Sequence, residues 1–426
     1  MRITRTSRFT CVVIIAIALQ TAVAFAATVQ VGTAPFCKGT LVHFSTITAA
    51  VEAVPSGSTV YVCPGTYPEQ VSIISKQISL IGVQTTTGTP TITSPAGGLV
   101  ANSTSLSSGN PIAAQILIQG APGLSNVSNL SVDGSGNNVT GCSPPTIIGI
   151  YYQNSSGTVN HVATRNQLQD PNDQGCQNGL GIFVQSGNSG TSTVTVSASS
   201  VHSYQKNGIT GNEPGTTITV TGNTVVGLGP TTGAAENGIQ IGFGATGKIQ
   251  NNTTIDDIWA PDTFTDPGDA AAGILIYASP NVITSGNTVG NTQFGIAYVT
   301  DMNYGAADNG TITGNKVSAT HIFDAIDLCN NNNTVTGNII NSADEAGIHL
   351  DGTCSGTGNN NTVKSNTITE SCAGLLISTG TGQFATTPNT YYDVLGTTVA
   401  GDTCQSNLAE APTKKLVRRI PKPVRP

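Results

Sequence analysis

Charged residues are scarce in this chain of 426 residues, where they make up only 9%. The shortage is greatest for cations: only seven of the 16 lysines and arginines lie between residues 27 and 405, whereas all 23 acidic residues lie between Glu52 and Glu410. Nucleic-acid binding needs lysines and arginines gathered against the phosphates. We therefore expect no nucleic-acid partner.

Long apolar runs are also rare, and the one present is at the N-terminus. The run Cys11–Leu19 follows Arg2, Arg5 and Arg8 and precedes a cleavage site at Ala24–Ala26. This pattern is typical of a secretory signal peptide over residues 1–26, and the run is too short for a membrane span. We expect a secreted monomer, extracellular or at the cell surface, without membrane insertion.

The sequence is rich in a two-part repeat. An Ile/Val-x-x-Asn motif carries Asn223, Asn252, Asn315, Asn338 and Asn366. It alternates with a Gly-Ile-x-Leu motif that begins at Gly238, Gly273 and Gly347, and with small changes at Ala325 and Gly374. Such short strands cannot bury their apolar faces alone, but stacked copies share one core. The repeats therefore predict an all-β solenoid.

The repeat also predicts where side chains point. The asparagines should stack as a ladder of side-chain amides at a sharp turn, where Asn tolerates the left-handed backbone conformation. In each Gly-Ile strand the apolar residues face inward, so the residues between and after them face outward. Two outward columns follow: Thr210, Gln240, Leu275, Ala297, Asp327, His349 and Leu376, and then Asn212, Gly242, Tyr277, Val299, Cys329, Asp351 and Ser378.

A short helix should precede the first coils. Ser45 can cap it, apolar side chains from Ile47 to Val54 recur on one face, and Pro55 ends it. An open solenoid end exposes apolar core, so we expect this helix to cover the N-terminal end of a parallel β-helix from about residue 55 to 385. We assign residues 27–405 to the capped β-helix and 406–426 to a basic, proline-rich, flexible tail.

The segments Phe44–Val51, Gly57–Val71 and Ile78–Gly82 resemble the opening of pectin-lyase-like right-handed parallel β-helix proteins. The later repeats resemble the coils of that superfamily, so the resemblance covers roughly residues 40 to 380. It implies a right-handed parallel β-helix but no single activity, because the superfamily holds lyases, hydrolases, esterases and epimerases. Members that act on polyuronates generally use Arg or Lys, and this chain has no run of outward cations.

Nine cysteines are present, and Cys11 belongs to the signal peptide. An even remainder in an exported chain, without a Cys-x-x-Cys pair, favours disulfides over zinc. We expect Cys37–Cys63, which flank the capping helix, and Cys329–Cys354, which one coil separates. Cys142–Cys176 and Cys372–Cys404 then follow by elimination.

One polar cluster stands out in the outward columns. Asp327 and His349 fall on adjacent coils, and Asp351 lies two residues further along. A histidine held by a carboxylate can move protons near neutral pH, which predicts an acid/base site. Gathered carboxylates could also hold Ca²⁺ through oxygen ligands. The alternative is a ladder of polar residues without chemistry.

Candidate substrate-binding residues surround this cluster. Trp259, the only tryptophan, lies in the longest insertion beside several aspartates, Tyr277 is in the outward column, and Asp324 precedes Asp327. An aromatic ring beside carboxylates suits a sugar, which offers an apolar face and hydroxyl edges. Trp259 could equally pin its loop to the β-helix.

Three functions remain open. The first is a secreted protein that binds an extracellular polysaccharide. The second is a polysaccharide lyase or glycoside hydrolase that works through Asp327, His349 and Asp351. The third is a structural surface or matrix protein without catalysis.

Overall fold

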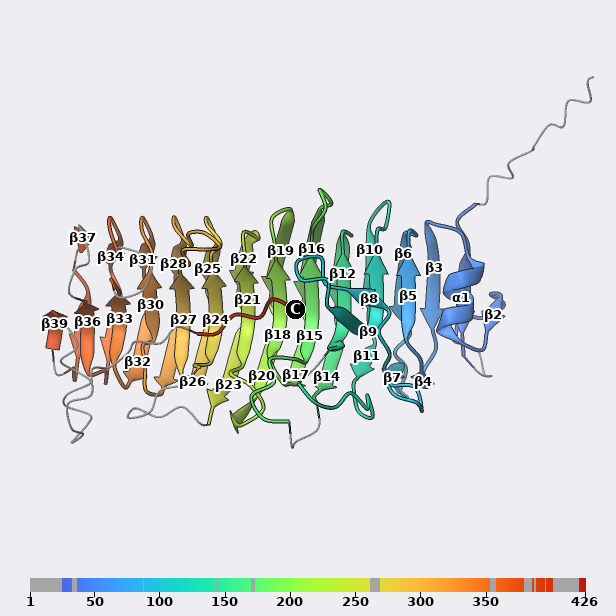
Figure 1. Ribbon diagram of the computed structural model, residues 1–426, viewed down its shortest axis with the longest axis horizontal. Coiled ribbons are helices and arrows are strands. Elements are labelled where there is room, and N and C mark those ends of the chain that lie inside the picture. Colours follow the sequence, from blue (N-terminus) through green and yellow to red (C-terminus); the bar gives the residue numbers. More distant parts are fainter. Residues whose placement is uncertain are drawn as a thin grey trace, which may run out of the picture.

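The chain folds into a long stack of β-strand coils in the computed structural model (Figure 1). The structure describes residues 25–32, 37–86, 88–142, 144–169, 173–260, 269–352, 358–378, 385–386, 388–394, 396–400 and 421–426. Most of the predicted signal peptide thus lies outside the described residues. No helix among those described is long and apolar enough to cross a membrane.

Three parallel sheets run the length of the stack. Sheet A contains β2 (His43–Phe44), β1 (Thr28–Val31), β3 (Ser58–Val62), β6 (Ile78–Gly82), β10 (Ser125–Ser128), β13 (Gly157–Asn160), β16 (Ser192–Ser197), β19 (Thr216–Thr221), β22 (Thr246–Gln250), β25 (Ile283–Ser285), β28 (Thr311–Thr313), β31 (Thr334–Thr336), β34 (Thr362–Lys364) and β37 (Ala385–Thr386).

Sheet B contains β4 (Thr66–Pro68), β7 (Thr91–Thr93), β11 (Ser131–Asp133), β14 (Ala163–Gln167), β17 (Ser200–Tyr204), β20 (Thr224–Thr231), β23 (Thr253–Trp259), β26 (Thr288–Thr292), β29 (Lys316–Thr320), β32 (Ile339–Ala343), β35 (Thr367–Thr369) and β38 (Thr390–Tyr392).

Sheet C contains β5 (Val71–Ile74), β9 (Pro111–Gln119), β12 (Thr146–Gln153), β15 (Leu180–Gln185), β18 (Asn207–Asn212), β21 (Asn237–Gly242), β24 (Ala272–Tyr277), β27 (Phe294–Val299), β30 (Ile326–Cys329), β33 (Ala346–Leu350), β36 (Ala373–Ile377) and β39 (Gly396–Ala400). The short strand β8 (Ser103–Thr104) pairs with β9 in the antiparallel sense.

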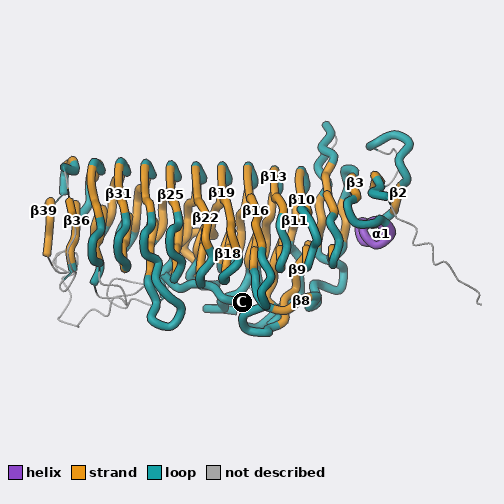
Figure 2. Tube along the Cα trace, turned by 90° about the horizontal axis from the view of Figure 1, so that it is seen from above, coloured by secondary structure: helices purple, strands orange, loops and turns teal. Residues whose placement is uncertain are grey.

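Each coil contributes one strand to each sheet in turn, so the inward Val and Ile side chains of all coils meet on the axis. They form one buried cluster that extends from Val29 to Leu375. Figure 2 shows the coils from above as evenly spaced rungs. Neighbouring strands in a hydrogen-bonded sheet generally lie about 4.8 Å apart. The predicted solenoid is confirmed.

The glycine of the Gly-Ile motif is required because its position faces the core. A Cβ atom at Gly238 would collide with the Thr254 hydroxyl and lie 2.7 Å from the Gly273 carbonyl oxygen of the next coil. A side chain there would push neighbouring coils apart. The glycine of this motif therefore allows close packing between sheets and does not indicate a flexible turn.

The asparagine ladder is confirmed at the turn from sheet A to sheet B. The side-chain amide of each ladder residue donates to the side-chain oxygen of the next, as in Asn252 to Asn287 at 3.0 Å. The left-handed conformation, however, belongs to the residue before each ladder asparagine. Asn251, for example, has φ 56° and Gly286 has φ 65°. The ladder asparagine is needed for its hydrogen bonds, and the preceding Gly, Asn or Ser makes the turn.

The predicted capping helix is α1 (Ile47–Ala53), and it lies at the N-terminal end of the stack (Figure 1). Its N-cap is Thr46 rather than Ser45, because the Thr46 hydroxyl accepts from the Ala49 amide. The Glu69 carboxylate accepts from two further amides of the first turn. Strand β1 pairs with β3, so the sheets begin before the helix and not at residue 55.

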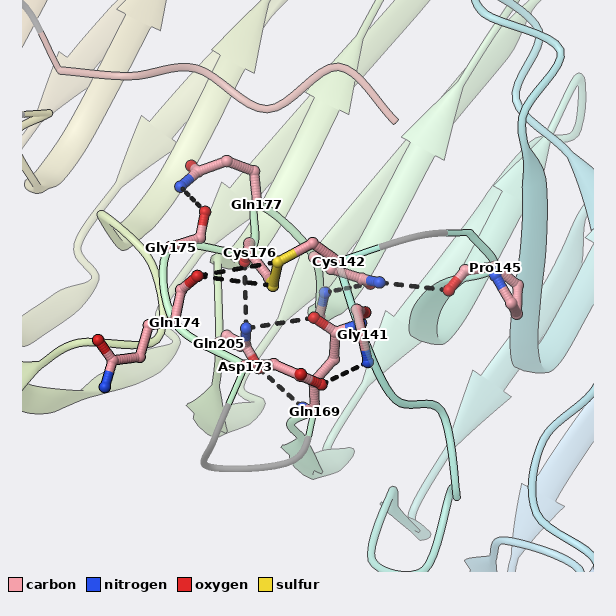
Figure 3. Close-up of a disulfide and its surroundings, with 12 residues drawn as sticks. Gly141, Cys142, Pro145, Gln169, Asp173, Gln174, Gly175, Cys176, Gln177 and Gln205 are labelled. Carbon is pink, nitrogen blue, oxygen red and sulfur yellow. Dashed lines mark hydrogen bonds between the residues drawn. A yellow bond between two sulfur atoms is a disulfide. The ribbon is translucent and has the colours of Figure 1, made fainter.

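Two predicted disulfides are confirmed. The pair Cys37–Cys63 has its Cα atoms 5.5 Å apart, and Cys142–Cys176 has them 4.9 Å apart. Figure 3 shows the second bridge together with Gly141, whose amide donates to the Asp173 carboxylate. Cys329 and Cys372 are each disulfide-bonded. Their predicted partners, Cys354 and Cys404, lie outside the described residues.

Candidate functional site

The outer face of sheet C carries the two outward columns that the repeat predicts. Strand register places Gln240 opposite Leu275, Leu275 opposite Ala297 and Ala297 opposite Asp327. Asp327 is in turn opposite His349. Tyr277 is opposite Val299, which is opposite Cys329 in the second column. The face therefore presents two continuous lines of side chains along the axis.

His349 lies in a buried hydrogen-bond chain at the C-terminal part of this face. Its Nδ1 atom is 3.0 Å from Asp324 Oδ2, and its Nε2 atom is 2.6 Å from Ser378 Oγ. A carboxylate only accepts, so Nδ1 carries the proton and Nε2 faces the serine hydroxyl. From the outward column of the sequence we predicted that Asp327 is the carboxylate that holds His349. Asp327 is its strand neighbour, but Asp324, from the turn before β30, makes this hydrogen bond.

The other acids gather near His349. Ligand atoms of Asp324, Glu345 and His349 lie within 4.8 Å of one another, and all three side chains are buried. Calcium takes six to eight oxygen ligands, and this set offers two carboxylates and a nitrogen. Asp327 and Asp351 approach Cys329, whose sulfur is already in a disulfide. These described residues do not match a calcium cage.

The predicted aromatic residues occupy different sheets. Tyr277 ends β24 on sheet C, where its hydroxyl donates to Asp301 and its ring packs 5.2 Å from that of Phe243. Burial raises the pKa of Tyr277. Trp259 ends β23 on sheet B, and its backbone is held by Gln293. Residues 261–268 of its loop lie outside the described residues. Trp259 therefore belongs to a strand of sheet B, whereas His349 belongs to sheet C.

A segment that sequence reasoning treated as flexible lies on the same face. Residues 421–426 cross sheet C along the axis from β24 towards β15, as the dark red trace shows (Figure 1). The Val424 amide donates to Gln240 Oε1 at 2.8 Å. The Val424 carbonyl oxygen accepts from Gln240 Nε2 and Asn212 Nδ2 at 2.9 and 2.8 Å. Residues 401–420 lie outside the described residues.

The side chains of this segment are also bound. Val424 is 3% exposed and packs in an apolar cluster with Tyr151 and Phe183. Arg425 donates to both carboxylate oxygens of Glu213, at 2.7 and 2.8 Å. The sequence contains one indication of this contact, because a basic, proline-spaced segment follows an acidic body. Sequence patterns give no register for such a contact.

Several buried groups are ionisable, and one of them, Lys206, contacts the segment. Lys206 Nζ donates to the carbonyl oxygen of Lys422 at 2.7 Å, and burial lowers the pKa of Lys206 to about 7. The Tyr204 hydroxyl donates to Asp257 Oδ1 at 2.6 Å. Burial raises the pKa of both Asp257 and Glu236 well above the usual carboxyl range.

Comparisons with known proteins agree on the fold. Residues 217–391 match the family described as right handed beta helix region. No curated protein sequence matches this chain significantly. A GH136 lacto-N-biosidase from Eubacterium ramulus has a TM-score of 0.59 and 12% identity, over 86% of this chain and 68% of that chain.

Two further solved structures are similar. The catalytic domain of a GH87 alpha-1,3-glucanase in complex with nigerose has a TM-score of 0.54 and 12% identity, over 80% of this chain and 63% of that one. PfbA, a surface adhesin of Streptococcus pneumoniae, has a TM-score of 0.50 and 16% identity, over 82% and 86%. Such identities show the fold alone. The fold is that of a right-handed parallel β-helix.

Proposed function

We propose that this protein is secreted and binds an extracellular polysaccharide along the outer face of sheet C. One observation carries the proposal: an extended segment, residues 421–426, already lies along the axis on this face. Its carbonyl and amide groups meet the side-chain amides of Asn212, Asn237 and Gln240. A polysaccharide is likewise a linear chain whose hydroxyl and carbonyl groups need such partners.

The rings beside this line suit sugars. Phe243 and Tyr304 lie with their ring centroids 5.0 Å apart in an edge-on arrangement, and Tyr304 is 47% exposed. An aromatic face can pack against the apolar face of a pyranose. The glycoside hydrolases that share the fold support a carbohydrate ligand, and the surface adhesin supports an extracellular place of action.

A second candidate, catalysis on the polysaccharide, is favoured by the Asp324–His349–Ser378 chain. A base held by a carboxylate and facing a hydroxyl has the arrangement that activates a serine nucleophile. The reaction class would be acyl transfer. The Ser378 oxygen attacks an ester carbonyl while His349 takes its proton. The alcohol then leaves with that proton, and water hydrolyses the acyl-enzyme. Lyase or hydrolase chemistry through Asp327, His349 and Asp351 is the competing form of this candidate.

The binding proposal is tested on a glycan panel with the full-length chain carrying Arg425→Glu, whose like charge faces Glu213 and frees the face. Adding Asn212→Ala and Gln240→Ala should weaken glycan binding about tenfold, because several hydrogen bonds are lost. Gln250→Ala on sheet A is the matched control and should leave affinity unchanged. The proposal fails if the Arg425→Glu protein binds no glycan, or if the control loses as much affinity.

The catalytic candidate is tested by turnover of acylated and unsubstituted polysaccharides. Ser378→Ala and His349→Gln should each lower release of acyl groups at least about a hundredfold, whereas His321→Gln should not. The unfolding midpoint is measured for each variant, so that a loss of rate is assigned to chemistry only where the fold is intact. Full turnover by an intact Ser378→Ala protein would exclude the nucleophile.

A further inference from the structure

The part of sheet C that holds residues 421–426 binds the main-chain groups of two alternate residues, Lys422 and Val424. Asn237 Nδ2 and Lys206 Nζ both donate to the Lys422 carbonyl oxygen, at 2.9 and 2.7 Å. Gln240 both accepts from the Val424 amide and donates to its carbonyl oxygen. The side chains of Lys206, Asn237 and Gln240 are fully buried. Two alternate residues of the segment, Lys422 and Val424, thus bind to side chains of β21, and Lys206, which directly precedes β18, adds a second donor to Lys422. Main-chain contacts of this kind set the register of a bound peptide.

The same face also has a site for a cation. The guanidinium carbon of Arg425 lies 4.9 Å from the ring centroid of Phe243 and 4.7 Å from that of Tyr304. Glu213, which is 8% exposed, closes this aromatic clamp with two hydrogen bonds. A planar guanidinium between aromatic faces and a carboxylate satisfies both cation–π and bidentate geometry. A neutral sugar has no charge to place there.

Three further contacts fix the ends and the middle. The Lys422 ammonium pairs with Asp269 at 2.6 Å. The Val424 side chain fills the apolar cluster of sheet C. The Pro426 carbonyl oxygen accepts from the hydroxyls of Ser105 and Ser108. Pro421, Pro423 and Pro426 restrict φ in the segment, so it loses little conformational entropy on docking.

From these contacts we infer that the outer face of sheet C contains a binding site for a basic, proline-spaced peptide, and that residues 421–426 occupy it as a self-blocking ligand. The inference rests on the proposed function, because the segment takes the side-chain amides that would bind a polysaccharide. Polysaccharide and peptide therefore compete for Asn212, Asn237 and Gln240. The docked segment keeps the face closed, and displacing it opens the face.

Docking is tested first by reversal of charge in the full-length chain. Arg425→Glu and Glu213→Lys should each speed hydrogen exchange at the amides of Lys422, Val424 and Arg425 at least about tenfold, since each places like charges together. The double variant Glu213→Lys/Arg425→Glu should restore slow exchange. Lys364→Glu is the control, because it replaces an exposed cation of sheet A with an anion, as Arg425→Glu does on sheet C. It should not alter the exchange of these amides. Equal exchange in wild type and both single variants would overturn the inference.

The peptide site is tested separately in trans. A fluorescein-labelled peptide Pro-Lys-Pro-Val-Arg-Pro should bind the Arg425→Glu protein, whose own segment is displaced, and bind wild type at least tenfold more weakly. A peptide of the same composition in scrambled order should not bind. Failure of the first peptide to bind the Arg425→Glu protein would overturn the site.

Competition is then measured with the glycan panel. Glycan binding by the Arg425→Glu protein but at least tenfold weaker binding by wild type supports self-blocking. Equal binding by both proteins overturns self-blocking and leaves the proposed function standing. Absence of glycan binding in both overturns the proposed function and the competition. The peptide titration alone still decides whether the outer face of sheet C binds the peptide.

Discussion

At the residue scale, each ladder asparagine satisfies polar groups at the turn from sheet A to sheet B. Asn287 accepts from the backbone and side-chain amides of Asn252, at 2.9 and 3.0 Å. It donates to the Ile249 carbonyl oxygen and to Asn315. All these groups are buried, so no solvent can replace the contacts. The asparagine is therefore structural, and its repetition in the sequence says nothing about a ligand.

Asn287→Ala should lower the free energy of unfolding by about 2–4 kcal/mol, because it leaves buried donors of Asn252 without their acceptor. Asn303→Ala, at an exposed turn, should change it by less than about 0.5 kcal/mol. Chemical denaturation of both variants measures the difference. Equal stabilities would show that the ladder contributes nothing.

At the scale of elements, the junction of sheets B and C buries two acids, Glu236 and Asp257. Asp257 accepts from Tyr204 and Thr254, and Glu236 accepts from the Leu228 amide at 3.1 Å. Burial is the largest cause of the raised pKa of each carboxyl. Desolvation thus favours the protonated acids in the folded protein.

The raised pKa of these carboxyls makes the free energy of unfolding depend on pH. A carboxyl whose pKa is raised in the folded state stabilises the fold fully below its unfolded pKa of about 4, and this contribution is lost as the pH rises through the folded pKa. The unfolding free energy should therefore fall as the pH rises above about 4. Asp257→Asn should flatten this fall, and Asp393→Asn, at an exposed position, should not. Denaturation at a series of pH values tests this, and parallel profiles for wild type and Asp257→Asn would contradict it.

At the scale of the whole molecule, stability comes from contacts between neighbouring coils. The loss of stability caused by a substitution in one coil should therefore become smaller with distance along the stack. The N-terminal end has a neighbour on one side only. There α1 covers the first coils, and the Cys37–Cys63 disulfide ties the segment before the helix to β3's end.

Replacing both Cys37 and Cys63 with Ser should cost about 3 kcal/mol, the loop-closure entropy that the bridge removes from the unfolded chain. The loss should appear as faster hydrogen exchange in β1 and β3, with β27 to β33 unchanged. The Cys142→Ser/Cys176→Ser protein is the control, because it should loosen the coils around β12 and β15 instead. Uniform loosening of every strand in either variant would contradict local coupling between coils.

The sequence by itself determined the coil frame and the side-chain columns. Inward Ile and Val at every second position fix the register, because a slip by one residue would turn the apolar side chains outward. The strand neighbours Asp327 and His349 follow from that register, as does the stacking of the ladder asparagines. Periodic spacing carries this information because each coil repeats the one before it.

Only the tertiary structure decided the contacts that break the repeat. Asp324 reaches His349 from a turn whose path no strand pattern specifies. His349 is buried although its side chain points outward from the strand. The alternation of apolar and polar residues predicts which way a side chain points, but not whether another part of the chain covers it. Val424 meets Asn212 across 212 positions of sequence. Such contacts depend on which surface of the finished β-helix is complementary in shape, charge and hydrogen bonding, and that surface exists only once the coils have stacked.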